Sequence, residues 1–284
     1  KHRIPAQLLK SGVRREKEIL LYLKANLYLI MESHIANMLK KERHAYIIKQ
    51  INLHNKVLSS SVSLQLQVSE DTVRRDLFEL AEAGEVIKVH GGALSKSYHF
   101  PIQQNVVYAK DAKVEIAKKA VGLIKKGMII LTEAGTTMME MVKLIPANME
   151  ATFFTVSPLI ALELAEHPLL TVILLGGQID MSAQICIGEK PVRELSEIKV
   201  DLCFLGANAI DSKQGLTEID WRVVQVKKSM IDAAAKLAIL TISEKLNSAH
   251  KMQVCDPRHI DYLITELKPG DERLAAYRKH ITVL

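Results

Sequence analysis

Three short polar segments in the C-terminal two thirds of the chain follow apolar runs and combine hydroxyl groups with glycines. Glu133-Ala-Gly-Thr-Thr137 opens a helix-like segment, so free backbone amides, two hydroxyls and the helix dipole converge there. Thr155-Val-Ser-Pro158 repeats this arrangement, with its serine as a helix cap. Leu175-Gly-Gly-Gln178 lets backbone approach a ligand closely, because glycine has no Cβ. Together these segments predict a site for a phosphate-sized anion.

A fourth segment, Gly206–Gly215, follows another apolar run, and Lys228 and Lys245 lie downstream as charge partners. Each of these features also has an ordinary explanation, since such glycines often only form turns and most lysines are solvated. The spacing does not fix which of them converge.

A second polar group lies nearer the N-terminus and begins at Ser69-Glu-Asp-Thr72. A serine cap followed by two carboxylates matches the unpaired amides and positive dipole end of a helix. On that helix Thr72, Arg75 and Glu79 share one side, and Arg74 lies between this side and the apolar one. Such side chains can read base edges and phosphates, although Arg75 and Glu79 also have the spacing of an ordinary helical ion pair.

Three helix-like segments and a ribbon position this group. Leu39–Leu53 carries an apolar stripe, Ser60 or Ser61 can cap a short second helix, and the third helix runs from Ser69 to about Ala83. Glu85–Leu94 alternates and ends in a glycine pair, which indicates a strand and a tight turn. This order predicts a mostly α winged helix-turn-helix, whose third helix enters the DNA major groove.

The rest of the chain alternates helix-like and strand-like segments. We expect helices at Lys113–Lys126 and Thr136–Leu144. Short apolar runs occupy Met128–Thr132, Thr152–Val156, Thr171–Leu175, Leu202–Leu205, Leu237–Ile242 and Tyr262–Thr265. Runs that are apolar on both faces predict an α/β domain with a largely parallel sheet, in which ligands gather at the carboxyl ends of the strands.

The N-terminal module resembles the DeoR family of bacterial transcriptional regulators. The family signature is present as Arg43, Ile47 and Ile51 at four-residue steps, a 17-residue gap, and Ser69-x-x-Thr-Val-Arg-Arg-Asp-Leu77. The resemblance implies DNA contacts from the third helix and the wing, by Ser69, Thr72, Arg74, Arg75, Lys88 and His90. Family members typically begin close to the equivalent of Met38, so we expect residues 1–37 to be an extra amphipathic helix or not native.

The resemblance covers nearly all of residues 38–284, and the C-terminal part is similar to the family's sensor domain. That domain shares its fold with ribose-5-phosphate isomerase and commonly recognises phosphorylated sugars. The effector-binding residues that the resemblance implies are Lys113, Glu133, Gly135, Thr136, Thr137, Ser157, Gly176, Gly177, Lys228 and Lys245. Glu133 stands where the family usually has Asp, Val156 replaces an Asn, and Ser243-Glu-Lys245 replaces a Ser-Lys pair. These departures favour phosphate binding with an altered or smaller effector.

Positive charge is concentrated at the start of the chain. Residues 1–37 hold 7 Lys and Arg against 3 Asp and Glu, residues 38–94 hold 8 against 7, and residues 95–284 hold 23 against 22. A DNA-binding module with so little net charge binds weakly alone, so we expect a homo-oligomer, dimer or tetramer, on half-sites spaced by turns of the duplex. The expected domains are a DNA-binding domain at 38–94, a linker at 95–110 and an effector-sensing domain at 111–284.

Composition excludes several classes of protein. With 284 residues, 48% hydrophobic, 13 Gly and 8 Pro, the chain is neither collagenous nor of low complexity. Three cysteines without a CxxC pair or a histidine at ligand spacing predict no metal site, and no cofactor fingerprint is present. The apolar stretch from Ile19 to Met31 is interrupted and too short for a span, so we expect no membrane partner and a cytoplasmic location.

We therefore expect a DNA-binding regulator, a repressor of carbohydrate metabolism genes, whose partners are an operator duplex and a phosphorylated sugar, and not an enzyme. One alternative is a sugar-phosphate isomerase with an appended DNA-binding module, for which Asp211, Glu218 and Glu133 are available bases. Another is a protein-interaction module, for which Arg75→Ala would leave all binding unchanged.

Overall fold

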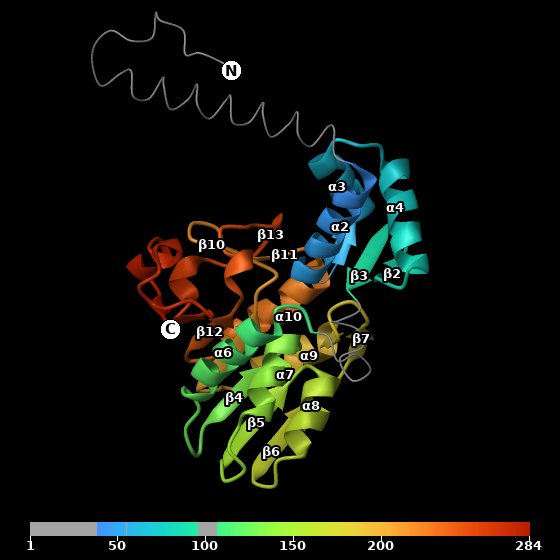
Figure 1. The fold of residues 1–284 in the computed structure, drawn as a ribbon. Helices are drawn as coiled ribbons and strands as arrows, with labels where there is room; N and C mark the ends of the chain where they lie inside the picture. The colour runs from blue at the N-terminus through green and yellow to red at the C-terminus, as the bar shows by residue number, and fades with distance from the viewer. Residues whose placement is uncertain (1–38, 55, 96–106) are drawn as a thin grey trace, which may run out of the picture. The chain divides into compact units, whose positions relative to one another are not determined.

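The computed structural model describes residues 39–54, 56–95 and 107–284 (Figure 1). This chain divides into two compact units. The first holds the residues up to Lys49 together with Val57–Ala93, and the second holds Gln50–Lys56 together with Leu94–Leu284. Each unit buries its own apolar side chains.

In its described residues, the first unit contains three helices and a three-stranded sheet. The helices are α2 (Lys40–His54), whose last residues belong to the second unit, α3 (Ser59–Leu66) and α4 (Glu70–Glu82). The strands lie in the order β1 (Lys56–Leu58), β3 (Gly92–Ser95) and β2 (Val86–Val89). The predicted helix-turn-helix order is confirmed, whereas β1 was not predicted because three residues are too few to show an alternating pattern.

Local sequence explains where α4 begins and ends. The Ser69 hydroxyl accepts a hydrogen bond from the Thr72 amide at 3.2 Å, as a helix cap does, and Glu70 and Asp71 occupy the first turn. The helix stops where Gly84 adopts a φ of 72°, a conformation that glycine takes without steric cost. One face of α4 is buried through Val73, Leu77 and Leu80, which leaves the opposite face in solvent.

The second unit is built on a seven-stranded sheet in which every neighbouring pair is parallel. Across the sheet the strands are β15 (Thr282–Val283), β14 (Tyr262–Ile264), β12 (Leu237–Leu240), β9 (Leu202–Gly206), β4 (Ile129–Thr132), β5 (Ala151–Thr155) and β6 (Leu170–Leu174). The predicted α/β domain with a largely parallel sheet is thereby confirmed.

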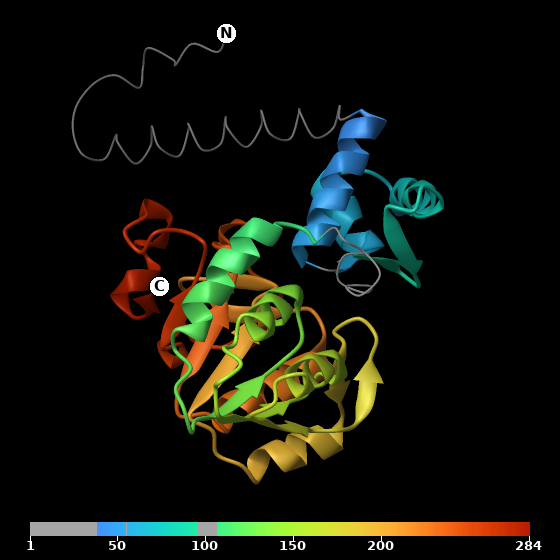
Figure 2. The ribbon, with the colours of Figure 1, turned by 60° about the horizontal axis from the view of Figure 1, so that its bottom comes forward.

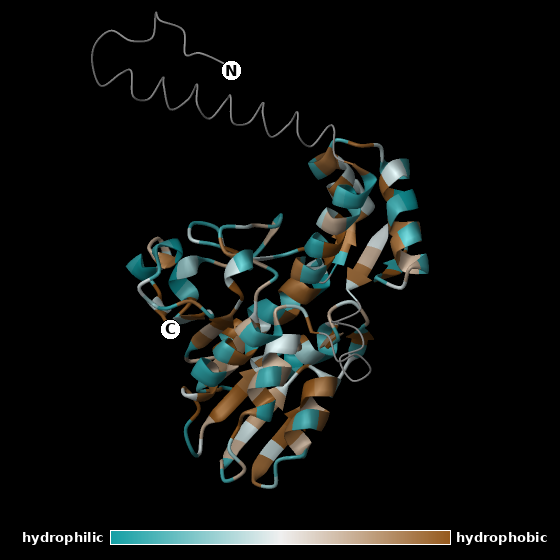
Figure 3. Ribbon diagram, in the orientation of Figure 1, coloured by the Kyte–Doolittle hydropathy of each residue, from teal (hydrophilic) through white to brown (hydrophobic). Residues whose placement is uncertain are grey.

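Helices cover both faces of this sheet (Figures 1 and 2). On one face lie α6 (Lys110–Val121), α7 (Thr136–Lys143) and α8 (Pro158–Ala165), and on the other α9 (Glu189–Ser196) and α10 (Trp221–Asp232). Alternate strand residues feed the two cores, so that Phe204 packs with the first set while Cys203 and Leu205 pack with the second. The strands are accordingly the most uniformly apolar elements, and the helices alternate in hydropathy (Figure 3).

Smaller elements follow the carboxyl ends of the strands. A hairpin of β7 (Gln178–Asp180) and β8 (Ile185–Ile187) comes after β6. An antiparallel sheet contains β10 (Ala209–Asp211), β11 (Gly215–Glu218) and β13 (Met252–Cys255). Short 3-10 turns are η2 (Ser243–Lys245), η3 (Pro257–His259), η4 (Glu272–Leu274) and η5 (Tyr277–Lys279). The hairpin, β11 and η2 contribute residues to one pocket.

Candidate functional site

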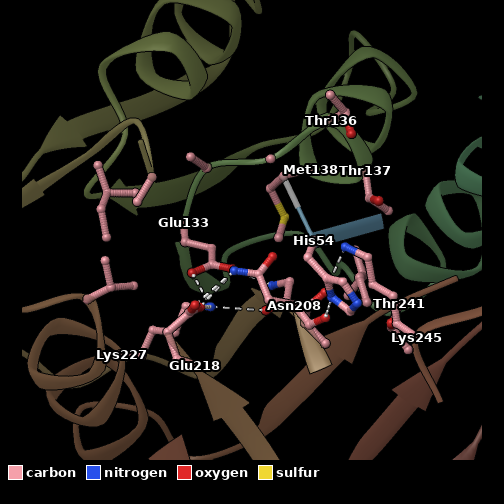
Figure 4. Close-up of a pocket in the computed structure, with 18 of the residues that line it drawn as sticks. His54, Glu133, Thr136, Thr137, Met138, Asn208, Glu218, Lys227, Thr241 and Lys245 are labelled. Atoms are coloured by element: carbon pink, nitrogen blue, oxygen red, sulfur yellow. Dashed lines mark hydrogen bonds and ion pairs between the residues drawn. The ribbon is translucent and has the colours of Figure 1, made fainter. Parts of the chain in front are cut away.

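A pocket of the second unit opens at the carboxyl ends of the sheet strands (Figure 4). Its walls come from the segment after β4 (residues 133–138), the end of β9 with the two residues that follow it (206–208) and the segment after β12 (241–245). Residues of α6, α10, β11 and the β7–β8 hairpin also line the pocket. Parallel α/β sheets bind ligands at this edge, because the loops that follow the strands meet there.

One end of the pocket holds a buried ammonium between two buried carboxylates. Lys227 Nζ lies 3.0 Å from Glu218 Oε2 and 3.5 Å from Glu133 Oε2. Burial alone lowers the pKa of Lys227, but the two carboxylates outweigh it and raise that pKa above its ordinary value. Burial also raises the pKa of Glu133, against the opposing effect of Lys227. The two carboxylates therefore present more hydrogen-bond acceptor oxygens at the pocket wall than the single ammonium occupies.

Glu218 is the better supported of the two carboxylates. Both of its oxygens accept hydrogen bonds from Asn208 Nδ2 at 2.9 Å, and Oε1 also accepts one from the Ile219 amide at 2.8 Å. Burial raises its pKa, but Lys227 and these donors outweigh that effect and lower it overall. Glu133 Oε1 accepts from the Gly206 amide at 2.5 Å. Glu218 is thus a fixed anion.

The other end of the pocket holds two lysines that form no ion pair with any carboxylate among the described residues. Within the described residues, Lys113 is 8% exposed, makes no ion pair, and lies 5.9 Å from the Tyr108 ring. Lys245 Nζ donates to the Ala207 carbonyl at 3.0 Å. Burial lowers the pKa of Lys113 to about 8, and burial with the charges of Lys113 and Lys227 lowers that of Lys245 to about 7. Two ammonium groups held in this way favour an anion between them.

The N-terminus of α7 faces the same space. Gly135 caps the helix with a φ of 133°, a conformation that residues with a Cβ rarely adopt, and Thr136 and Thr137 place two hydroxyls in the first turn. The first amides of a helix have no acceptor within the helix. Amides, hydroxyls and the helix dipole thus add to the two lysines as an anion site.

His54 also lines the pocket, from the end of α2 that belongs to the second unit. Its Nδ1 lies 2.8 Å from the Asn208 carbonyl oxygen, and its ring meets the ring of His250 edge-on at 5.2 Å. Burial is the main reason that the pKa of His54 falls to about 4. The ring is therefore neutral at pH 7 and donates through Nδ1.

The pocket brings together six of the ten effector residues that the sequence predicts. They are Lys113, Glu133, Gly135, Thr136, Thr137 and Lys245. The other four do not line it. Ser157 caps α8, and Gly177 lies where a Cβ would meet the Ile187 carbonyl at 2.9 Å. Gly176 lies near Lys190, and Lys228 Nζ stands 6.0 Å from the ring of the exposed Trp221.

Sequence reasoning missed Lys227 and Asn208, and assigned Glu218 only to the enzyme alternative. A usable signal for Lys227 exists in the helical spacing of α10. Val223, Lys227 and Met230 recur at steps of four and three residues, and all three are buried. A lysine on an apolar stripe needs a buried partner, which distinguishes Lys227 from its neighbour Lys228.

In the first unit, the exposed face of α4 carries the residues expected to contact DNA. Arg75 is exposed and takes part in no hydrogen bond or ion pair within the described part of the chain. Its expected partner Glu79 pairs instead with Lys40 at 2.6 Å. Arg74 bonds Glu70 and Asp71 at 3.3 and 3.4 Å. Arg75 is therefore the arginine of α4 that is available to a ligand.

The remaining expected contacts lie at the start of α4 and on the wing. The hydroxyls of Ser69 and Thr72 are 2.8 Å apart at the helix N-terminus. Lys88 Nζ lies 5.0 Å from the centre of the exposed Phe78 ring, and His90 is exposed. All four residues are at or near the surface, as contact with a nucleic acid requires.

A buried ion pair fixes α4 against α2. Arg43 donates from Nε to Asp76 Oδ2 at 2.5 Å and from Nη2 to Oδ1 at 3.0 Å, and His44 Nε2 lies 3.1 Å from the same Oδ1. Asp76 is 2% exposed. The hydrogen bond with Asp76 is the main cause that raises the pKa of Arg43. This bidentate pair explains why an arginine precedes the first apolar stripe and an aspartate follows Arg75.

Comparison with known families agrees with this architecture. A model of the DeoR-like helix-turn-helix domain matches residues 43–98, and a model of the DeoR C-terminal sensor domain matches residues 109–267. The chain belongs to the DeoR family. The family resemblance expected from the sequence is thus confirmed, and the chain is a helix-turn-helix transcriptional regulator rather than an enzyme.

Curated relatives of this DeoR-family chain are named as regulators. It is 29% identical to the transcriptional regulator GolR of Listeria innocua, over 80% of this chain and 91% of GolR. It is 30% identical to the transcriptional repressor GlcR of Bacillus subtilis, over 82% and 91%. It is 31% identical to the transcriptional regulator GlpR of Haloferax volcanii, over 81% and 91%.

Solved structures give more distant likenesses to the DeoR-family chain. Ribose 5-phosphate isomerase A of Methanocaldococcus jannaschii is 20% identical with a TM-score of 0.36, over 48% of this chain and 54% of the isomerase. The tetrameric eIF2B-beta2-delta2 complex from C. thermophilum is 14% identical with a TM-score of 0.46, over 95% and 100%.

Other kinds of site were also sought in the part of the chain that the structure describes. Within it, no group of three or more His, Cys, Asp or Glu side chains is placed to hold a metal ion. Cys186, Cys203 and Cys255 are free thiols in buried positions. No helix among the described residues is both long and apolar enough to cross a bilayer.

Proposed function

We propose that the protein represses carbohydrate metabolism genes and that a phosphorylated sugar bound in the pocket sets its affinity for the operator. The observation that carries this proposal is the buried ammonium of Lys113, which forms no ion pair in the described part of the chain and lines the pocket with Lys245 and the N-terminus of α7. A phosphate dianion supplies the two negative charges and the acceptor oxygens that this arrangement favours.

The opposite end of the pocket supports a hydroxyl-bearing ligand. Carboxylate oxygens of Glu133 and Glu218 and the Asn208 amide line the wall there. Acidic and amide oxygens accept hydrogen bonds from sugar hydroxyls, and a neutral His54 adds a polar edge without charge. A molecule with phosphate at one end and hydroxyls at the other satisfies both ends, whereas free phosphate satisfies only one.

The proposed control of DNA binding is thermodynamic linkage. An effector that favours an arrangement unable to span both half-sites lowers operator affinity by its differential binding, commonly about 1–3 kcal/mol. We propose that the protein acts as a homo-oligomer, dimer or tetramer, in the cytoplasm, because one weakly charged module needs a second half-site and the operator lies there. Relatives include a protein named the L-fucose operon activator of Escherichia coli, and activation uses the same thermodynamics.

The test is fluorescence anisotropy of the full chain on its own upstream DNA, at two salt concentrations, with pairs of phosphorylated and unphosphorylated sugars. We expect salt-sensitive, sequence-preferring binding that one phosphorylated member weakens and its unphosphorylated partner does not. Lys113→Met should abolish this response, whereas Lys118→Met, on the same helix in an exposed pair with Glu115, should preserve it. A response that survives in Lys113→Met refutes the assignment of the pocket.

A further inference from the structure

One hydrogen bond links the residues just before α6 to the turn η2, and both of these segments lie next to a lysine of the pocket. The Tyr108 hydroxyl donates to the Glu244 carboxylate, with distances of 2.8 and 2.9 Å to its two oxygens. Tyr108 is the second described residue after segment 96–106, which in the sequence connects the helix-turn-helix residues to the α/β unit. Glu244 lies in η2, directly before Lys245.

Both partners of this bond adjoin a pocket lysine. The Tyr108 ring lies 5.9 Å from Lys113 Nζ, and Lys113 is in the first turn of α6, which starts at Lys110. Lys245 follows Glu244 in the chain and lines the pocket. The chain at the start of α6 and the turn η2 therefore each provide two side chains. One is a lysine of the pocket, and the other is a partner in the hydrogen bond.

This geometry sets two opposed forces between α6 and η2. The ammonium groups of Lys113 and Lys245 repel each other across the pocket, and the Tyr108–Glu244 bond holds the same two segments together. An anion between the lysines removes the repulsion, so it acts in the same direction as the hydrogen bond. Two links that tie the same pair of segments reinforce each other.

We propose that the Tyr108–Glu244 hydrogen bond transmits pocket occupancy to the start of α6, which follows segment 96–106 in the sequence. This inference rests on the proposed function, because it takes an anion to be the occupant of the pocket. Tyr108 and Glu244 do not line the pocket, so their effect on the ligand is exerted through Lys113 and Lys245. The bond is therefore a positioning device, and the same coupling makes it a determinant of anion affinity.

Hydrogen exchange of the full chain, with and without inorganic phosphate, tests the proposal. In the unaltered protein phosphate should slow exchange at residues 135–139 of α7 and, by about fivefold or more, at residues 108–113. In Tyr108→Phe the α7 amides should still be protected, while protection at residues 108–113 is lost and phosphate binds more weakly. Tyr262→Phe is the matched control, because its hydroxyl accepts an exposed hydrogen bond from Lys236 Nζ, neither residue lines the pocket, and its loss should change neither segment.

The outcomes separate the inference from the proposed function. Suppose that phosphate protects α7 and that its effect at residues 108–113 is the same in Tyr108→Phe as in the unaltered chain. This result overturns the inference and leaves the anion pocket intact. Absence of protection at α7 in the unaltered chain overturns both. Glu244→Gln tests whether Glu244 acts through its charge alone. If this variant binds phosphate more tightly and Tyr108→Phe has no effect, Glu244 acts only by repelling the anion, and the inference is overturned.

Discussion

Lys227 and Glu218 form an ion pair of 3.0 Å in which both side chains are 5% exposed. Glu133 lies on the other side of the same ammonium, at 3.5 Å. Removing the ammonium leaves two carboxylates facing each other in the interior, whereas removing either carboxylate leaves one pair intact. The lysine is therefore the member of this cluster on which the unit depends most.

Lys227→Met should destabilise the protein by about 3–5 kcal/mol, because it leaves buried charge without a partner. Urea unfolding of the full chain, followed by circular dichroism, measures this. The neighbouring Lys228→Met changes an exposed side chain and should alter the free energy of unfolding by less than about 0.5 kcal/mol. Equal losses in the two variants would show that the ion pair contributes nothing specific.

Anion binding should weaken as pH rises from 7 to 9. Lys245 and Lys113 have pKa values lowered to about 7 and about 8, so they lose their charge over this range while a phosphomonoester stays dianionic. Binding restores the protons, and affinity for a phosphorylated ligand should fall roughly tenfold or more. Calorimetry in two buffers of different ionisation enthalpy detects the proton uptake. A flat profile contradicts the assignment of these two lysines.

The stability of the unliganded protein should change in the opposite sense over the same range. A lysine keeps an ordinary pKa of 10.5 when unfolded, so between about pH 7 and that value the unfolded chain binds more protons than the folded one. The free energy of unfolding therefore rises with pH in this window. Urea midpoints from pH 7 to 9 measure the slope, and Lys245→Met should reduce it.

Arg75→Ala should reduce operator affinity by about 1–3 kcal/mol, a factor of about 5 to 150, if Arg75 reads a base pair. Arg258 is the matched control, since it is an exposed arginine of the other unit that bonds Asp256. Anisotropy titrations on operator and random duplexes at the same salt concentration distinguish loss of specificity from loss of charge. Unchanged binding in Arg75→Ala supports the protein-interaction alternative.

Gly135→Ala should weaken phosphate binding, although the added methyl group displaces no neighbouring atom. A Cβ at Gly135 meets no atom within 4 Å, so the cost comes from the φ of 133° and is about 1–3 kcal/mol of backbone strain. Relief of that strain turns the first amides of α7 away from the pocket. Gly270→Ala, with equally open surroundings and no positive φ, should bind phosphate normally. Identical affinities for the two variants would exclude α7 from the site.

The elements of this protein were largely predictable because local patterns produce them. The cap at Ser69, the stop at Gly84 and the short apolar runs of the parallel sheet act over a few residues, and each is found where the sequence indicated it. Two-residue and three-residue strands such as β15 and β1 were not predicted, because they are too short to show any periodicity in hydropathy.

The pocket was less predictable, because its members converge only through the fold. Lys227 and Lys228 are adjacent in sequence, and the rotation of α10 alone decides which one is buried between carboxylates. Ser157 has the residue type and position of a ligand-binding turn, yet its hydroxyl accepts from the Ile160 amide as a cap. Residue type predicted the chemistry, whereas the packing of helices on the sheet decided which residues take part.

The charged groups at the two ends of the pocket, Lys113, Glu133, Glu218, Lys227 and Lys245, are spread along the second unit, and strands far apart in sequence must pair before these groups meet. The helix-turn-helix unit is complete by Ala93, before the first of these groups has been synthesised. On a ribosome, the DNA-binding residues are therefore made first and the sensor is assembled last. Under the proposed function, a chain that ends early carries the residues expected to contact DNA without the pocket that would release them, so completing the C-terminal strands would be part of the control of the gene.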